Sequence, residues 1–227
     1  MKLQNDFQER TDDIEAYFSL LKFVDSIEAY KNIPIAYGRE TLSVTSDMQK
    51  CLRANAILLL YNIVESTINN CIWRIYDAIH DNQTTYDRLS TALKKIWLKK
   101  EYKENQTLPN IRNKTFNLIK DHTHKTIQFE QIVDSISGNL DLRKIEQIFI
   151  EYDCPINFSY DKEKVSKYLL YTKACRNSLA HGNTSFSQKG SMLLVSELIE
   201  AKDQLINFLS SLINRVEDFV IQKKYLA

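Results

Sequence analysis

The stretch "CRNSLAHGN", residues 175–183, holds one of the four histidines of the chain, directly before a glycine and five residues after an arginine. An imidazole moves protons near neutral pH, and a guanidinium neutralises charge on a phosphate. Arg176 and His181 therefore suit the cleavage of a phosphodiester. The alternative interpretation is that both are surface residues of a helix C-terminus, where basic side chains are common.

Helical spacing relates the neighbours of this pair. Asn177 and His181 are four residues apart, so they share a face and the amide can orient the imidazole; Lys173 extends that face by one turn. Gly182 is typical of the position just past a helix end, so we expect His181 in the last turn. Arg176 and His181 are separated by about 140° around an ideal helix. The two side chains therefore cannot both point along one narrow line, although arginine is long enough to bend toward the site.

A second arginine–histidine pair, Arg74 and His80 in "RIYDAIH", has a similar spacing. With nine arginines and four histidines in the chain, about half a match is expected by chance. Ile75 follows Arg74 directly and is a candidate for the core. We interpret this second pair as accidental.

The composition is ordinary for a globular protein, with 227 residues, 44% apolar and 26% charged. Only four glycines and three prolines occur, which favours long helices over a many-stranded sheet. The net charge of +1 means that any attraction for a polyanion must come from local patches.

The cysteines show no C-x-x-C pair, so we expect reduced thiols at Cys51, Cys71, Cys154 and Cys175. The polar N-terminus does not resemble a signal peptide, and the apolar run "AILLLYNIV" is too short to span a bilayer. We therefore expect a cytoplasmic protein with no membrane association.

Apolar residues recur at helical spacing along most of the chain, which predicts an all-α fold. The predicted helices cover residues 5–31, 46–80, 86–105, 140–152, 161–180 and 194–222. We expect no strand pair, internal repeat or low-complexity segment.

The stretch "CRNSLAHGN" resembles the motif of the HEPN superfamily ribonucleases, which carry an arginine, a polar residue, several others and a histidine. "LLLYNIVESTINNCIWRIYDAI" is similar to the second helix of that superfamily, and "SGNLDLRKIEQIFIEYDCP" to the segment before the motif helix in a branch found in toxin–antitoxin and restriction-like loci. The resemblance covers residues 5–222 and is weakest at 83–136. It implies a single HEPN domain over residues 1–227, an up-and-down helical bundle with a helical insertion before the motif helix.

The same resemblance implies roles for individual residues. Arg176 and His181 match the catalytic pair, Asn177 the polar residue and Glu65 the acidic residue of the second helix. It also implies a homodimer that cleaves RNA without a metal or other cofactor, using the ribose 2′-hydroxyl as nucleophile. The expected setting is a toxin or antiphage effector restrained by a partner, such as a nucleotidyltransferase-type antitoxin.

Further residues are candidates for RNA contact. A basic helix near Trp97 could follow an RNA backbone with Lys94, Lys95, Lys99 and Lys100. The alternative is a solvated helix face with Trp97 in the core. Tyr171 precedes the motif by about one and a half turns, and we expect it to line the cleft.

The sequence also bears on functions other than RNA cleavage. His122 and His124 in "DHTH" have no neighbouring set of ligands, so no metal site is expected. A DNA-directed nuclease usually needs an acidic metal cluster, which the sequence lacks. The main alternative is a non-catalytic HEPN dimer that serves as an RNA-binding or scaffold subunit of a defence complex.

Overall fold

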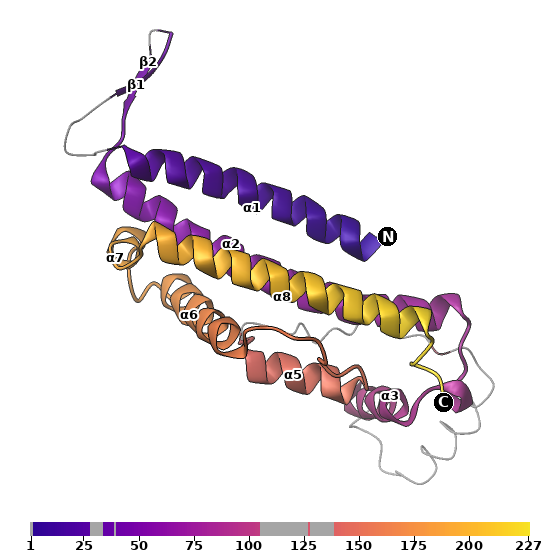
Figure 1. Ribbon diagram of the computed structural model, residues 1–227. Helices are drawn as coiled ribbons and strands as arrows, with labels where there is room; N and C mark the ends of the chain where they lie inside the picture. Colours follow the sequence, from indigo (N-terminus) through magenta and orange to yellow (C-terminus); the bar gives the residue numbers. More distant parts are fainter. Residues whose placement is uncertain (1, 28–33, 39, 105–126, 128–138) are drawn as a thin grey trace. The chain divides into compact units, whose positions relative to one another are not determined.

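The structure is a computed structural model of the chain, drawn as a ribbon in Figure 1. It describes residues 2–27, 34–38, 40–104, 127 and 139–227. Helices dominate these residues, so the predicted all-α fold class is confirmed. The chain divides into two compact units, which are described one at a time.

The first unit lies within Met1–Thr67, Gly138–Leu142 and Tyr160–Ser210. In it, helix α1 (Lys2–Ser26) packs against the first parts of α2 (Ser46–Asp81) and α8 (Val195–Ile221). The Tyr17 hydroxyl donates to the Leu52 carbonyl at 2.7 Å, and Lys202 forms an ion pair with Glu15. The core of this unit includes Phe18, Leu21, Ile57, Leu60, Leu205 and Phe208.

A short hairpin joins α1 to α2, where we predicted no strand pair. Strands β1 (Pro34–Tyr37) and β2 (Glu40–Ser43) pair in antiparallel register, and Gly38 in the turn has a φ of +60°. The prediction was wrong because strands of four residues are too short to show a clear alternation of apolar and polar positions.

Helix α6 (Lys162–Ala180) carries the arginine–histidine motif, and both of its ends are capped. The Asp161 carboxylate accepts from the Lys164 N–H at 3.0 Å. At the other end, Gly182 has a φ of +68° and its N–H donates to the Leu179 carbonyl at 3.1 Å, which confirms the predicted helix end. His181 is the C-cap residue. A short helix, α7 (Phe186–Gly190), follows in the segment between the helices predicted over 161–180 and 194–222, where we predicted no helix.

The second unit lies within Ile68–Ser137, Arg143–Ser159 and Ser211–Ala227. It contains the later parts of α2 and α8, the 3₁₀ turn η2 (Tyr86–Arg88), α3 (Thr91–Glu104) and most of α5 (Leu142–Glu151). Here the Arg74 guanidinium lies 3.0 and 3.2 Å from the two carboxylate oxygens of Glu217. The hydroxyls of Tyr76 and Tyr152 form a hydrogen bond.

The predicted helices agree with the structure to within a few residues, with two differences. The first helix ends at Ser26 instead of residue 31, and the helix predicted over 86–105 begins only at Thr91. Ser90 interrupts it, because its N–H donates to the Tyr225 carbonyl and its hydroxyl accepts from the Leu93 N–H. Much of the insertion predicted over 83–136 lies outside the described residues.

None of the helices in the described ranges has the length and apolarity that a membrane-spanning segment requires. All four cysteines are free thiols, and Cys71, Cys154 and Cys175 are buried.

Gly190 generates a stability prediction, because α7 touches the backbone of α2 at this residue. A Cβ atom at Gly190 would lie 1.8 Å from the Lys50 carbonyl oxygen. We expect Gly190→Ala to push α7 away from α2 and to lower the free energy of unfolding by about 3 kcal/mol, measured by urea denaturation.

Gly182→Ala is the matched comparison, because a Cβ there meets nothing within 4 Å and only the positive φ opposes it. We expect that variant to lose about 1 kcal/mol. Equal losses in the two variants would argue against a steric origin at Gly190.

Candidate active site

Arg176 leaves α6 on the side that faces α2. Its guanidinium carbon lies 5.1 Å from the centre of the Tyr61 ring, and Tyr61 itself is 1% exposed. The Nη1 group donates to the Asn177 side-chain oxygen at 3.1 Å. The guanidinium is therefore held at one face and one edge, and its other N–H groups form no hydrogen bond with any described residue.

His181 is exposed at the C-terminal end of α6, and within the described ranges its imidazole forms no hydrogen bond. The Asn177 amide does not orient it, contrary to the expectation from their four-residue spacing. That amide accepts from Arg176 and donates to the Asn139 side chain at 3.3 Å. Only the backbone links the two residues, because the His181 N–H donates to the Asn177 carbonyl at 3.1 Å.

The segment 139–141 holds α6 from a second direction. Lys173 forms an ion pair of 2.9 Å with Asp141, and the side chain of each partner is only about a quarter exposed. Leu140, which lies between Asn139 and Asp141, is buried. Lys173 was expected only as part of the motif face, and in the structure it also ties α6 to the segment 139–141.

Glu65 lies one turn after Tyr61 on α2, in the same unit as the motif. Burial raises the pKa of the Tyr61 hydroxyl, the Glu65 charge raises it further, and the Leu140 backbone and Arg176 oppose the rise. Glu65 and Arg176 are therefore both close enough to Tyr61 to change the pKa of its hydroxyl, in opposite directions.

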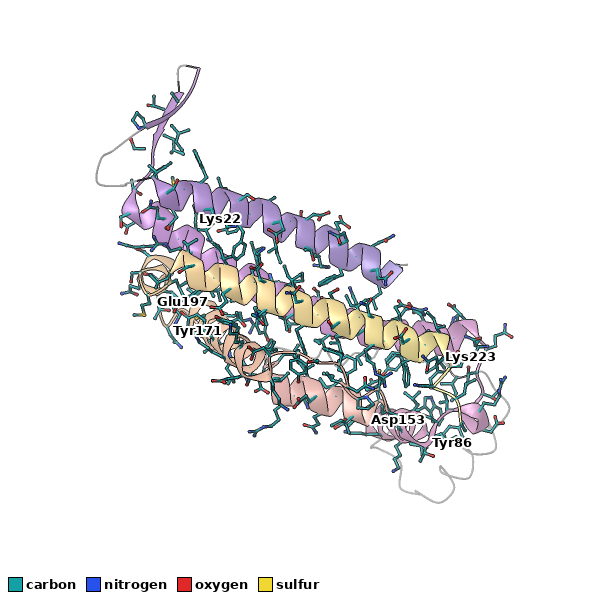
Figure 2. The ribbon with its side chains drawn as sticks, in the orientation of Figure 1. Lys22, Tyr86, Asp153, Tyr171, Glu197 and Lys223 are labelled. Atoms are coloured by element: carbon teal, nitrogen blue, oxygen red, sulfur yellow. The ribbon has the colours of Figure 1, made fainter. Side chains whose placement is uncertain are left out.

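Tyr171 lines an open groove between α6 and the start of α8, where Figure 2 shows it beside Glu197. Burial, followed by the nearby Cys175 and Glu197, raises the pKa of Tyr171 to about 12. Its phenol is thus protonated at neutral pH and forms an aromatic wall. The groove has a volume of about 500 Å³ and is lined by Lys167, Tyr168, Leu170, Tyr171, Leu193, Leu194, Glu197, Leu198 and Ala201.

The other candidates lie elsewhere. The lysines of α3 belong to the second unit, where Lys94 donates to the Asp87 carbonyl and Lys95 and Lys99 are exposed. Trp97 is buried. This agrees with the alternative interpretation of this helix, in which the lysines are solvated and Trp97 belongs to the core. The Lys100 side chain, His122 and His124 are outside what the structure describes. The residues that it does describe contain no group of three or more side chains suited to hold a metal ion.

The second arginine–histidine pair is accounted for by other contacts. Arg74 is bound by both carboxylate oxygens of Glu217, and the His80 side chain is 65% exposed beside Asp81. This arrangement favours the interpretation of that pair as accidental.

Sequence analysis missed three residues that contact the motif: Tyr61, Asn139 and Asp141. The last two belong to the "GNLD" segment, which was recognised as a resemblance but given no contact. Tyr61 had one usable indication, because it precedes Glu65 by one helical turn and so shares its face.

Among models of known protein families, the one described as HEPN_MAE_28990-like HEPN matches residues 1–225. No curated protein and no solved structure matches the chain.

The Lys173–Asp141 pair yields a prediction for the stability of the site. Because both side chains are largely shielded, a double-mutant cycle of Lys173→Ala and Asp141→Ala should give a coupling of about 1 kcal/mol in free energy of unfolding. High salt should reduce this coupling.

The Lys164–Glu200 pair is the control, because it starts on the same helix and both of its side chains are nearly half exposed. We expect a smaller coupling there. A stronger coupling for Lys164 and Glu200 would show that the segment 139–141 does not fix α6.

Proposed function

Because the chain belongs to the HEPN family, whose model matches residues 1–225, we propose that it is a metal-independent endoribonuclease that acts as a homodimer. The observation that carries this proposal is the set of contacts that the Arg176 guanidinium makes. The guanidinium is held by Tyr61 and Asn177, and among the described residues only Asn177 accepts a hydrogen bond from it, which leaves most of its N–H groups for a phosphate.

The proposed reaction uses His181 and Arg176 in separate roles. The His181 imidazole accepts the proton of the ribose 2′-hydroxyl, whose oxygen then attacks the adjacent phosphorus. The bond from phosphorus to the 5′-oxygen breaks, that oxygen takes up a proton from imidazolium, and a 2′,3′-cyclic phosphate remains. Arg176 neutralises the charge that develops on the phosphate oxygens. Asn177 positions the guanidinium.

A second copy of the chain supplies the geometry that one α6 lacks. Within one protomer, Arg176 turns toward Tyr61, whereas His181 is exposed at the helix end. Two α6 helices related by a two-fold axis would place the arginine of one chain near the histidine of the other.

The exposed face of α6 supports such a dimer. Leu170, Ala174, Asn177 and His181 lie within about 60° of one another around an ideal helix. Leu170 and Leu194, which both line the groove, are 51% and 60% exposed, and the nearby Met192 is 69% exposed. We propose that the second copy covers this apolar face, because the face runs directly into the motif.

The alternative function is a non-catalytic HEPN dimer that binds RNA or acts as a scaffold in a defence complex. One observation favours it: no hydrogen bond joins the His181 imidazole to another described residue, so none of these residues orients it. The toxin or antiphage setting, the antitoxin-like partner and the cytoplasmic location stay predictions from the sequence.

We predict that Arg176→Ala and His181→Ala each slow RNA cleavage by about 100-fold or more, because each removes one half of the chemistry. The assay uses end-labelled RNA in excess EDTA, with mass spectrometry to identify cyclic phosphate ends. His80→Ala, which alters an exposed histidine of the accidental pair, should cleave at the unaltered rate. RNA binding without cleavage by the unaltered chain would favour the alternative function, and metal-dependent DNA cleavage would contradict both.

We predict that the double substitution Leu170→Glu and Leu194→Glu yields monomers that do not cleave RNA, because the charges would be buried in the proposed interface. Light scattering after size-exclusion chromatography measures the mass. Ile221→Glu is the control, since Ile221 is 72% exposed at the far end of α8. A double variant that stays dimeric would place the interface elsewhere.

A further inference from the structure

We propose that Tyr61 is a positioning residue for catalysis: its buried ring holds the Arg176 guanidinium in place without consuming the charge. This inference rests on the proposed function. Tyr61 belongs to α2, precedes the motif by more than a hundred residues in sequence, and has no part in the arginine–histidine motif itself.

The contact involves the ring of Tyr61 and not its hydroxyl. The ring is 1% exposed, and the guanidinium carbon lies 5.1 Å from its centre, within the range of a cation–π interaction. The hydroxyl is buried without a hydrogen-bond partner among the described residues.

The chain binds other arginines differently. Arg74 lies against both carboxylate oxygens of Glu217, and Arg53 forms an ion pair with Asp25. A carboxylate neutralises the guanidinium and occupies its donors in the plane. An aromatic face contacts the guanidinium from above, so the charge and the in-plane donors stay available to a phosphate.

Asn177 completes the support from the edge. Its side-chain oxygen accepts from Nη1 of Arg176, and its amide nitrogen is in turn held by Asn139. One face and one edge are thus fixed, which restricts a long side chain that would otherwise sample many rotamers. A catalytic group held in advance in its working position need not be ordered during the reaction.

The test compares variants of Tyr61 in the full chain. We expect Tyr61→Leu, which removes the π face, to lower kcat for RNA cleavage about three- to tenfold. KM should change little, because Arg176 acts on charge that develops in the transition state. Tyr61→Phe should retain the unaltered kcat, since it keeps the ring that contacts Arg176. Pentafluorophenylalanine at position 61 keeps the shape of Phe but reverses the charge distribution of the ring, so it should behave as Tyr61→Leu does.

Tyr225→Leu is the matched control for loss of packing. Tyr225 is 0% exposed, and its hydroxyl also lacks a partner among the described residues, but it belongs to the second unit, whereas Arg176 belongs to the first. We expect Tyr225→Leu to lower the free energy of unfolding while leaving kcat unchanged. An equal fall in kcat for Tyr225→Leu and Tyr61→Leu, or a normal kcat with pentafluorophenylalanine, would overturn the proposal.

A second measurement separates this inference from the proposed function. In a spectrum of the arginine side-chain N–H groups, the Arg176 signal should be shifted by the ring current of Tyr61, and Arg176→Lys assigns that signal. The shift should persist in Tyr61→Phe and vanish in Tyr61→Leu. If the chain cleaves no RNA but these shifts are seen, the proposed function fails while Tyr61 still positions Arg176. If the shift is absent from the unaltered chain, the contact itself is disproved.

Discussion

The contact between Arg176 and Tyr61 joins the two helices on which the candidate site depends. Arg176 is half-buried, and a carboxylate partner would neutralise its charge and occupy the donors with which it could bind an anion. The flat face of the buried Tyr61 ring attracts the cation without occupying those in-plane donors. The position of α6 against α2 therefore also sets the position of the charge that chemistry at the helix end would use.

Much of this arrangement could be predicted from the sequence because it follows from local rules. The spacing of apolar residues located α6 and α2, and Gly182 marked the end of the motif helix, as its positive φ confirms. The contacts that hold Arg176 could not be predicted in the same way. Helical spacing paired Asn177 with His181, whereas the amide instead binds the adjacent arginine and Asn139. Spacing says which side chains share a face, but it does not say which of several polar neighbours is bonded.

Contacts between segments far apart in the sequence account for the remaining differences. The ring of Tyr61, the Asp141 carboxylate and the Lys50 carbonyl each meet α6 or α7 from a different part of the chain. A single sequence does not show which residues of such distant segments are in contact. The hairpin β1–β2 was missed for a separate reason, since four residues in each strand carry too little periodic information.

The capping of α6 at both ends has a consequence for chain length. Each added residue turns the rest of a helix by about 100°. One insertion between Asp161 and Arg176 would therefore move the guanidinium away from the Tyr61 ring. Beyond Thr184 the chain has left the helix, and an extra residue there would be absorbed before α7 begins. The number of residues between Asp161 and His181 is therefore tightly constrained, whereas the number between Thr184 and α7 can vary. In chains that keep the same chemistry, we therefore expect the number of residues from Asp161 to His181 to be constant.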